Sequence, residues 1–168
     1  IKKLKLFSIN DKKDNFQILS HFFKGESQIL KIKHNNLIKN ISINLIGKIQ
    51  LKNILMAIIA AKKSNIDLNK ILLTIPKLKS VEGRFEKIGK IKNKSKVILD
   101  YAHTPEALKT CLLNLKEQFP GKKISLLFGC GGNRDQNKRS KMGKIADNYS
   151  DKIYLTDDNP RFENPNKI

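Results

Sequence analysis

Three polar segments of the sequence contain the residue types that could do chemistry. They run from Asp100 to Pro105, from Gly129 to Asp135 and from Thr156 to Arg161, and each follows a short apolar run. In the first segment, the Asp100 carboxylate can accept hydrogen bonds from a sugar diol, and the His103 imidazole can approach a phosphate. The structural alternative is that Asp100 caps local backbone amides and His103 packs on the turn.

Arginine is scarce in this chain, and its placement is therefore informative. Only four of the 34 basic residues are arginine, and Arg134 and Arg161 lie in the second and third polar segments. Where lysine is the default cation, an arginine indicates that its planar fork is needed, typically to bind a carboxylate or phosphate with two hydrogen bonds. We predict that both arginines bind an anionic group of a ligand. A pair of structural salt bridges is the alternative.

The glycines of the second segment allow close approach to a backbone or a ligand. Arg134 stands where a dinucleotide-binding fingerprint would have its third glycine. We therefore expect a tight strand-to-helix turn here and no NAD site. Cys130 has no neighbouring base in the sequence that would make it a nucleophile.

The elements that position these segments alternate between strand and helix. The apolar pattern predicts a buried strand at 97–99, a helix at 104–119, a strand at 123–128, a helix at 138–149 and a strand at 152–155. Thr104, Pro105 and Glu106 have the types expected at a helix N-terminus. This order is typical of a parallel α/β sheet, which binds ligands at the carboxyl ends of its strands.

The first half of the chain has a different pattern. Short apolar runs at 16–22, 28–32 and 41–46, with a break at 11–15, predict antiparallel strands. Helices are expected at 50–63 and 68–75, the second ended by Pro76. We place a domain boundary in the polar, lysine-rich stretch at 87–96.

Composition excludes several classes of protein. With 168 residues and 39% hydrophobic residues, the chain can bury a core. Its longest apolar stretch, residues 54–61, is too short to cross a bilayer. Two cysteines make neither a disulfide framework nor a zinc pattern, which favours the cytoplasm. No export signal is visible, and both ends indicate a fragment of a longer chain.

The net charge of +19 raises nucleic-acid binding as a different class of function. The lysines are scattered among Ile and Asn along the whole length, which indicates compositional bias and not a focused binding surface. We therefore expect no nucleic-acid partner, and keep a basic nucleic-acid-binding module as the non-enzyme alternative.

The three polar segments, quoted as DYAHTPEAL from Asp100, FGCGGNRD from Phe128 and TDDNPR from Thr156, resemble the Mur ligases. Leu45-Ile46-Gly47 and the stretch from Val81 to Glu86 resemble the same family, so the match runs from about Leu45 to Pro165. The resemblance implies an α/β fold. Residues 1–92 would be the end of the central ATP-binding domain, and residues 93–168 the start of a Rossmann-like C-terminal domain.

The resemblance also implies an activity. Such enzymes are cytoplasmic ATP-dependent amide ligases of peptidoglycan synthesis, in which a substrate carboxylate is activated as an acyl phosphate and then attacked by an amine. The implied small-molecule partners are UDP-N-acetylmuramoyl-L-alanyl-D-glutamate, meso-diaminopimelate and ATP. We expect a monomer. The ligands of the family's Mg²⁺ are expected outside this fragment, which should be inactive alone.

Roles carry over residue by residue from the resemblance. Asn53 would contact the adenine, and Arg84 and Asp100 the ribose or phosphates of ATP, with Asp100 and His103 as the catalytic pair. The incoming amino acid would be bound by Arg134 together with Asp158, Asn159, Pro160 and Arg161. Position 133 is Asn where several relatives have Asp, a change that we expect to be minor.

The loop from Asp158 to Arg161 resembles the version that selects meso-diaminopimelate over lysine. Diaminopimelate has an extra distal carboxylate, which a guanidinium can bind with two charge-assisted hydrogen bonds. Lysine would leave the guanidinium unpaired. The alternatives within the family are a lysine-adding member and folylpolyglutamate synthase.

Overall fold

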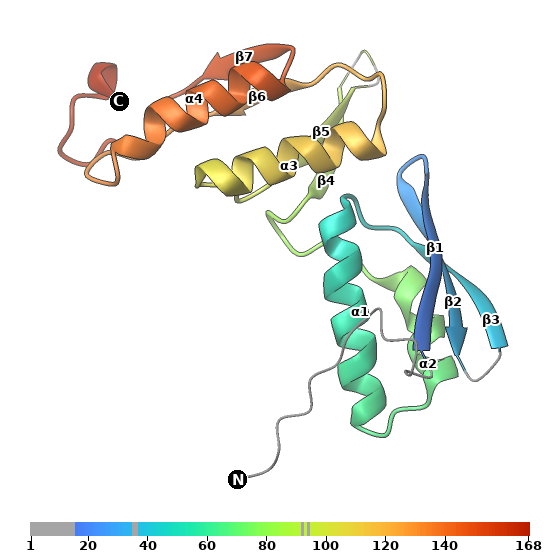
Figure 1. Cartoon of the computed structure of the whole chain (residues 1–168). Helices are drawn as coiled ribbons and strands as arrows, with labels where there is room; N and C mark the ends of the chain where they lie inside the picture. Colours follow the sequence, from blue (N-terminus) through green and yellow to red (C-terminus); the bar gives the residue numbers. More distant parts are fainter. Residues whose placement is uncertain (1–15, 35–36, 92, 94) are drawn as a thin grey trace, which may run out of the picture. The chain divides into compact units, whose positions relative to one another are not determined.

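The structure is a computed structural model that describes residues 16–34, 37–91, 93 and 95–168. It divides into two compact units, Ile1–Glu82 and Gly83–Ile168 (Figure 1). The predicted break at 11–15 lies outside the described residues. None of the helices in the described part of the chain is both long enough and apolar enough to span a bilayer.

The first unit contains an antiparallel sheet of three strands, β1 (Phe16–Lys24), β2 (Ser27–His34) and β3 (Leu37–Ile43), in that order. The three predicted strands are thereby confirmed, with β3 beginning and ending a few residues earlier than expected. Gly25 forms the β1–β2 turn with φ of 60°, a conformation that glycine adopts without steric cost. Along β2, Gln28, Leu30 and Ile32 are buried, which is the two-residue period of a sheet with one covered face.

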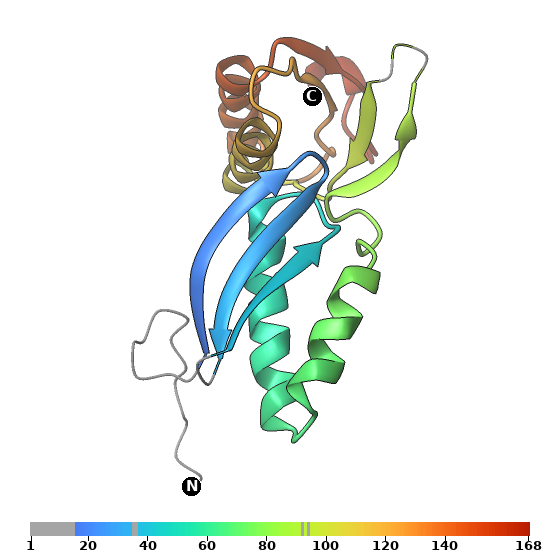
Figure 2. The same ribbon diagram turned by 90° about the vertical axis from the view of Figure 1, so that its right-hand side faces the viewer.

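Two helices pack on this sheet, α1 (Lys48–Lys63) and α2 (Leu68–Thr74), the latter followed by the short 3₁₀ helix η1 (Ile75–Lys77). Figure 2 shows α1 lying along one face of the sheet. Its buried residues recur at helical spacing, and with those of the strands they form a single aliphatic core: Leu30, Ile32, Ile41, Ile43, Leu51, Ile54, Leu55 and Ile58. Asp67 caps α2 by accepting a hydrogen bond from the Lys70 amide.

The second unit begins with an antiparallel pair, β4 (Glu86–Lys90) and β5 (Lys96–Leu99). The sequence prediction was wrong here in two respects. It assigned the β4 residues to a polar linker, and it expected Val97 and Leu99 to be buried in a parallel sheet, whereas they are 37% and 45% exposed. In this pair Glu86 lies opposite Leu99 and Lys90 opposite Lys96. The second compact unit begins at Gly83, and the domain boundary expected near residue 92 stays a prediction.

The rest of the second unit follows the predicted α/β order, with α3 (Pro105–Gln118), β6 (Ser125–Phe128), α4 (Asn137–Tyr149), β7 (Lys152–Leu155) and the 3₁₀ helix η2 (Pro165–Lys167). Strands β6 and β7 pair in parallel. Helices α3 and α4 lie side by side (Figure 1) and share a core of Leu108, Leu112 and Met142, against which β6 packs through Leu126 and Phe128. This packing brings the carboxyl ends of β6 and β7 to one edge.

Candidate functional site

The loops that follow β5, β6 and β7 line one cavity of about 940 Å³ within the second unit. The residues predicted for a functional site are brought together here: Asp100, His103, Arg134, Asp158, Asn159 and Arg161 all line the cavity. Pro160 lines a smaller neighbouring cavity of about 400 Å³ together with Asp158. The convergence of the three polar segments is therefore confirmed for residues 100–161, although β5 belongs to a different sheet from β6 and β7.

Asp100 holds two backbone amides in place. One carboxylate oxygen accepts a hydrogen bond from the Phe85 amide at 3.0 Å, and the other accepts one from the Ala102 amide at 3.0 Å. Phe85 is a bulky residue with a φ of 49°, a left-handed conformation that needs such support. The geometry matches the capping alternative, and through Phe85 it also fixes the turn that carries Arg84.

Arg84, Tyr101 and His103 form a stacked group beside this carboxylate. The Arg84 guanidinium carbon lies 4.5 Å from the centre of the Tyr101 ring, and the Tyr101 and His103 rings meet edge to face at 4.9 Å. His103 Nδ1 lies 3.1 Å from the Tyr101 carbonyl oxygen. If Nδ1 carries the proton, Nε2 keeps its lone pair for a ligand. Sequence reasoning missed Tyr101, although a tyrosine between Asp100 and His103 was a usable signal.

Lys138 is a second residue that sequence reasoning left without a role. Its ammonium donates a hydrogen bond to the His103 carbonyl oxygen at 2.8 Å, and the residue lines the cavity. Lys138 lies in the first turn of α4, so this bond ties the β5 loop to the helix that follows β6. Its only sequence signal was its position within the segment that resembles the Mur ligases.

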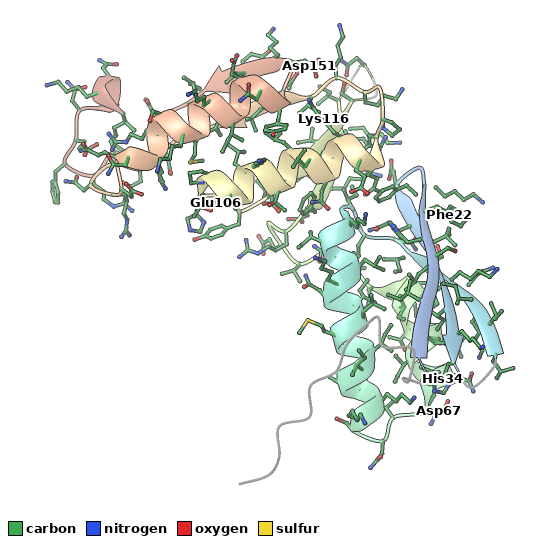
Figure 3. All side chains as sticks on the ribbon, viewed as in Figure 1. Phe22, His34, Asp67, Glu106, Lys116 and Asp151 are labelled. Atoms are coloured by element: carbon green, nitrogen blue, oxygen red, sulfur yellow. The ribbon has the colours of Figure 1, made fainter. Side chains whose placement is uncertain are left out.

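The N-terminus of α3 has the caps that the sequence predicted. The Thr104 hydroxyl accepts a hydrogen bond from the Ala107 amide, Pro105 is the first helical residue, and Glu106 lies in the first turn. In Figure 3, Glu106 marks this end of the helix and Lys116 the other. These contacts fix the exit of the loop that contains Asp100 and His103.

The glycine loop after β6 is a tight turn against the loop after β7. A Cβ at Gly129 would meet the Thr156 carbonyl oxygen at 2.3 Å, and one at Gly132 would meet the Pro160 carbonyl oxygen at 1.9 Å. The Gly132 amide donates to the Asn159 carbonyl oxygen at 2.9 Å. The glycines are therefore required by this close approach of two backbones, as the turn interpretation predicted.

Arg161 is held at the rim of the cavity by one nitrogen of its guanidinium. Nη1 donates to the Gly132 carbonyl oxygen at 2.7 Å and more weakly to that of Asn159 at 3.4 Å. Nε and Nη2 make no hydrogen bond to the part of the chain that the structure describes. These two nitrogens form one edge of the guanidinium, which is the geometry that binds a carboxylate with two parallel hydrogen bonds.

The residues after Arg161 are clamped to α4. The Glu163 carboxylate forms an ion pair with Arg139 and accepts a hydrogen bond from Gln136 Nε2 at 2.7 Å. The hydrogen bond from Arg139 and that from Gln136 hold the pKa of Glu163 below its ordinary value. The Glu163 carboxylate is therefore charged at neutral pH and keeps its ion pair with Arg139.

The cavity holds both signs of charge. Arg134, Lys138 and Arg161 line it together with the carboxylates of Asp100, Asp135 and Asp158. Such a set suits a ligand that itself has ammonium and carboxylate groups, because each group finds a partner of opposite charge. Within the described ranges, no group of three His, Cys, Asp or Glu side chains lies close enough together to hold a metal ion.

Two further residues of interest lie apart from the cavity lining. Asn53 belongs to the first unit, where it is exposed on α1 and donates to Gln50 Oε1 at 3.3 Å.

Cys111 is buried on α3. Burial, with a smaller effect of the Asp100 charge, raises the pKa of its thiol to about 12. The Cys111 thiol is therefore protonated at neutral pH and is no nucleophile.

Comparisons with known proteins show which family this chain resembles. The family model described as "Mur ligase, glutamate ligase domain" matches residues 83–168. The UDP-N-acetylmuramoyl-L-alanyl-D-glutamate--2,6-diaminopimelate ligase of Rickettsia typhi is 38% identical over 167 residues, which covers 92% of this chain and 33% of that protein. The chain thus spans about a third of the length of the curated relatives that it matches.

Solved structures show the same likeness. A structure of a UDP-N-acetylmuramoyl-L-alanyl-D-glutamate--2,6-diaminopimelate ligase superposes with a TM-score of 0.68 and 29% identity, covering 95% of this chain and 32% of that one. The MurF ligase of Thermotoga maritima in complex with ADP shares the fold, with a TM-score of 0.61 at 19% identity, covering 89% of this chain and 34% of that one. The model match over half of the sequence, with the site loops inside it, establishes that this chain belongs to the Mur ligase family.

Proposed function

We propose that the complete protein is a cytoplasmic, ATP-dependent ligase that adds meso-diaminopimelate to UDP-N-acetylmuramoyl-L-alanyl-D-glutamate. The observation that supports this most strongly is Arg161, which lies at the rim of a mixed-charge cavity with one edge of its guanidinium available. Relatives with the name of this activity match 92% of the chain. The two free cysteines are compatible with a reducing compartment.

The residues of this chain would bind and orient the reactants. ATP supplies the activation of the acceptor carboxylate, which the amine of the incoming amino acid then attacks. Arg84, stacked on Tyr101, and His103, through Nε2, are the candidates to contact the nucleotide. Asp100 supports them by fixing the two turns on which they lie. Positioning of this kind is a principal source of rate enhancement when two substrates must meet.

Arg134 and Arg161 would bind the carboxylates of the incoming amino acid. The Nε and Nη2 edge of Arg161 can bind the distal carboxylate of diaminopimelate with two charge-assisted hydrogen bonds. Lysine has no group for this edge, so the guanidinium would lose solvent without gaining a partner. The loop thereby favours diaminopimelate over the lysine-adding alternative within the family.

The experiment is an amino-acid panel with the complete enzyme. ATP-dependent ligation is measured with meso-diaminopimelate, L-lysine and L-glutamate as the incoming amino acid, each with UDP-N-acetylmuramoyl-L-alanyl-D-glutamate. We expect kcat/KM for diaminopimelate to exceed that for lysine by at least about 100-fold, in line with the cost of leaving a polar site unpaired. Equal or better use of L-lysine or of L-glutamate would overturn the proposal.

A further inference from the structure

The backbone of Arg161 has an unusual conformation. Its φ is 52°, in the left-handed region that bulky residues rarely adopt, and Asn133 across the site has a φ of 50°. A non-glycine residue persists in this region only where its surroundings hold it there. The direction in which the Arg161 side chain leaves the backbone is therefore set by what holds this conformation.

Two side-chain oxygens hold it, one on each side of the Arg161 Cα. The Arg161 amide donates to Asn159 Oδ1 at 3.1 Å, and the next amide along the chain, that of Phe162, donates to Asn133 Oδ1 at 2.9 Å. Asn159 lies in the same loop, whereas Asn133 reaches across from the loop after β6. The Phe162 side chain is 98% exposed, so it is the backbone amide that ties this point to the rest of the site.

The turn that presents Asn133 is itself fixed. Gly132 is buried, donates its amide to the Asn159 carbonyl oxygen at 2.9 Å and accepts a hydrogen bond from Arg161 Nη1 at 2.7 Å. The space for a Cβ at Gly132 is filled by Pro160. The turn that presents Asn133 is therefore locked to the loop after β7 by contacts of Gly132, which hold Asn133 Oδ1 within reach of the Phe162 amide.

We propose that Asn133 is a positioning residue that sets the direction of the Arg161 guanidinium and thereby the selectivity for an amino acid with a distal carboxylate. This inference rests on the proposed function. The group required is the side-chain oxygen that accepts from the Phe162 amide, which either asparagine or aspartate provides. Asparagine and aspartate are also the side chains that tolerate a left-handed backbone.

The test compares three variants in the complete enzyme. Asn133→Gly keeps the left-handed backbone but removes the oxygen, whereas Asn133→Asp keeps both. Asn65→Gly is the matched control, because Asn65 is also left-handed, with φ of 61°, and lies in the first unit after α1. We expect Asn133→Gly to raise the KM for diaminopimelate about tenfold, equivalent to about 1.4 kcal/mol, with the KM for ATP unchanged. Asn133→Asp and Asn65→Gly should both keep the parent values within about twofold.

A double-variant cycle shows whether Asn133 acts through Arg161. In an Arg161→Ala background, Asn133→Gly should cause no further rise in the KM for diaminopimelate, because the guanidinium that it positions is gone. Equal, additive rises in both backgrounds would overturn the inference, as would a loss in Asn133→Gly that Asn133→Asp fails to rescue. Thermal unfolding of each variant separates these outcomes from general destabilisation.

A structural readout keeps the inference separate from the proposed function. If the parent enzyme prefers another amino acid, the proposed function fails, but a crystal structure of Asn133→Gly still tests the positioning role. The Arg161 backbone should leave the left-handed region or the guanidinium should lose its bond to the Gly132 carbonyl oxygen. An unchanged Arg161 in that structure would overturn the inference whatever the substrate.

Discussion

The two units of the molecule use their strands in different ways. In the first unit, the sheet of β1, β2 and β3 is sealed by α1, and Leu30 and Ile43 are fully buried. In the second unit, α3 and α4 pack on β6, while Leu127 and Leu155 on the strands remain 68% and 75% exposed. The first unit is stabilised by one aliphatic core, whereas in the second unit hydrogen bonds join the loops to one another.

Residues with a left-handed backbone show the same difference between the two units. Outside glycine, the left-handed residues of the second unit are Phe85, Asn133 and Arg161 among those described, and each lies in or beside a loop of the site. Asp100 supports the first of them, and Asn133 and Asn159 support the third. Strained positions of this kind cluster at functional sites because the surrounding structure must over-determine them. The comparison therefore supports the proposal that the second unit contains the ligand-binding residues of this chain.

The largest effect is expected from truncating the core of the first unit. Leu30→Ala in the 168-residue chain should lower the free energy of unfolding by about 2–5 kcal/mol, because it leaves a cavity at a fully buried position. Leu127→Ala in the second unit should change it by less than about 0.5 kcal/mol, because that side chain is mostly exposed. Urea unfolding measures both, and similar losses would contradict the difference between the units.

An intermediate effect is expected where the two site loops touch. Gly132→Ala should raise the KM for diaminopimelate about tenfold or more, because its Cβ would overlap the Pro160 carbonyl oxygen and push the loops apart. Gly143→Ala is the matched control, because a Cβ there meets nothing within 4 Å and alanine favours the helix α4. Steady-state kinetics of the complete enzyme should find the parent KM in this control. A harmless Gly132→Ala would show that the close approach is not needed.

The smallest expected effect is the pH dependence that His34 gives to the stability of the first unit. Burial, with the charges of Lys62 and Lys39, holds the pKa of His34 below its ordinary value of 6.5. Protonation of His34 therefore costs more free energy in the folded than in the unfolded state. The stability that the neutral imidazole contributes is fully present above pH 6.5 and is lost as the pH falls through the pKa of the folded state. Urea unfolding should show stability rising with pH in this window. The dependence should be weaker in His34→Gln, and an identical dependence in the variant would assign it to another group.

Local sequence patterns predicted the helices and most strands because the buried residues of these elements recur with the period of a helix or a strand. The apolar spacing from Leu51 to Ile58 gave α1, and Thr104 with Pro105 gave the start of α3. Strand β4 was missed because three of its five residues are charged and because it is formed by pairing with β5, which no local pattern reveals.

The sequence predicted the location of the candidate site better than it predicted the contacts within the site. Strand order accounts for the meeting of the loops after β6 and β7, whereas the loop after β5 joins them from a separate antiparallel pair. Arg134 and Arg161 were found because arginine is rare in this chain. The hydrogen bond from the Phe85 amide to Asp100 and that from the Phe162 amide to Asn133 join residues 15 and 29 positions apart. Such contacts depend on how loops meet in space, so no spacing in the sequence could have shown them.

The central claim is that Arg161 binds the distal carboxylate of the incoming amino acid. The most direct test is the KM for meso-diaminopimelate and for ATP in the complete enzyme with Arg161→Ala. We predict that the KM for diaminopimelate rises about 100-fold, since a charge-assisted pair is lost, while the KM for ATP stays within about twofold. Equal and small changes in both constants would contradict the claim.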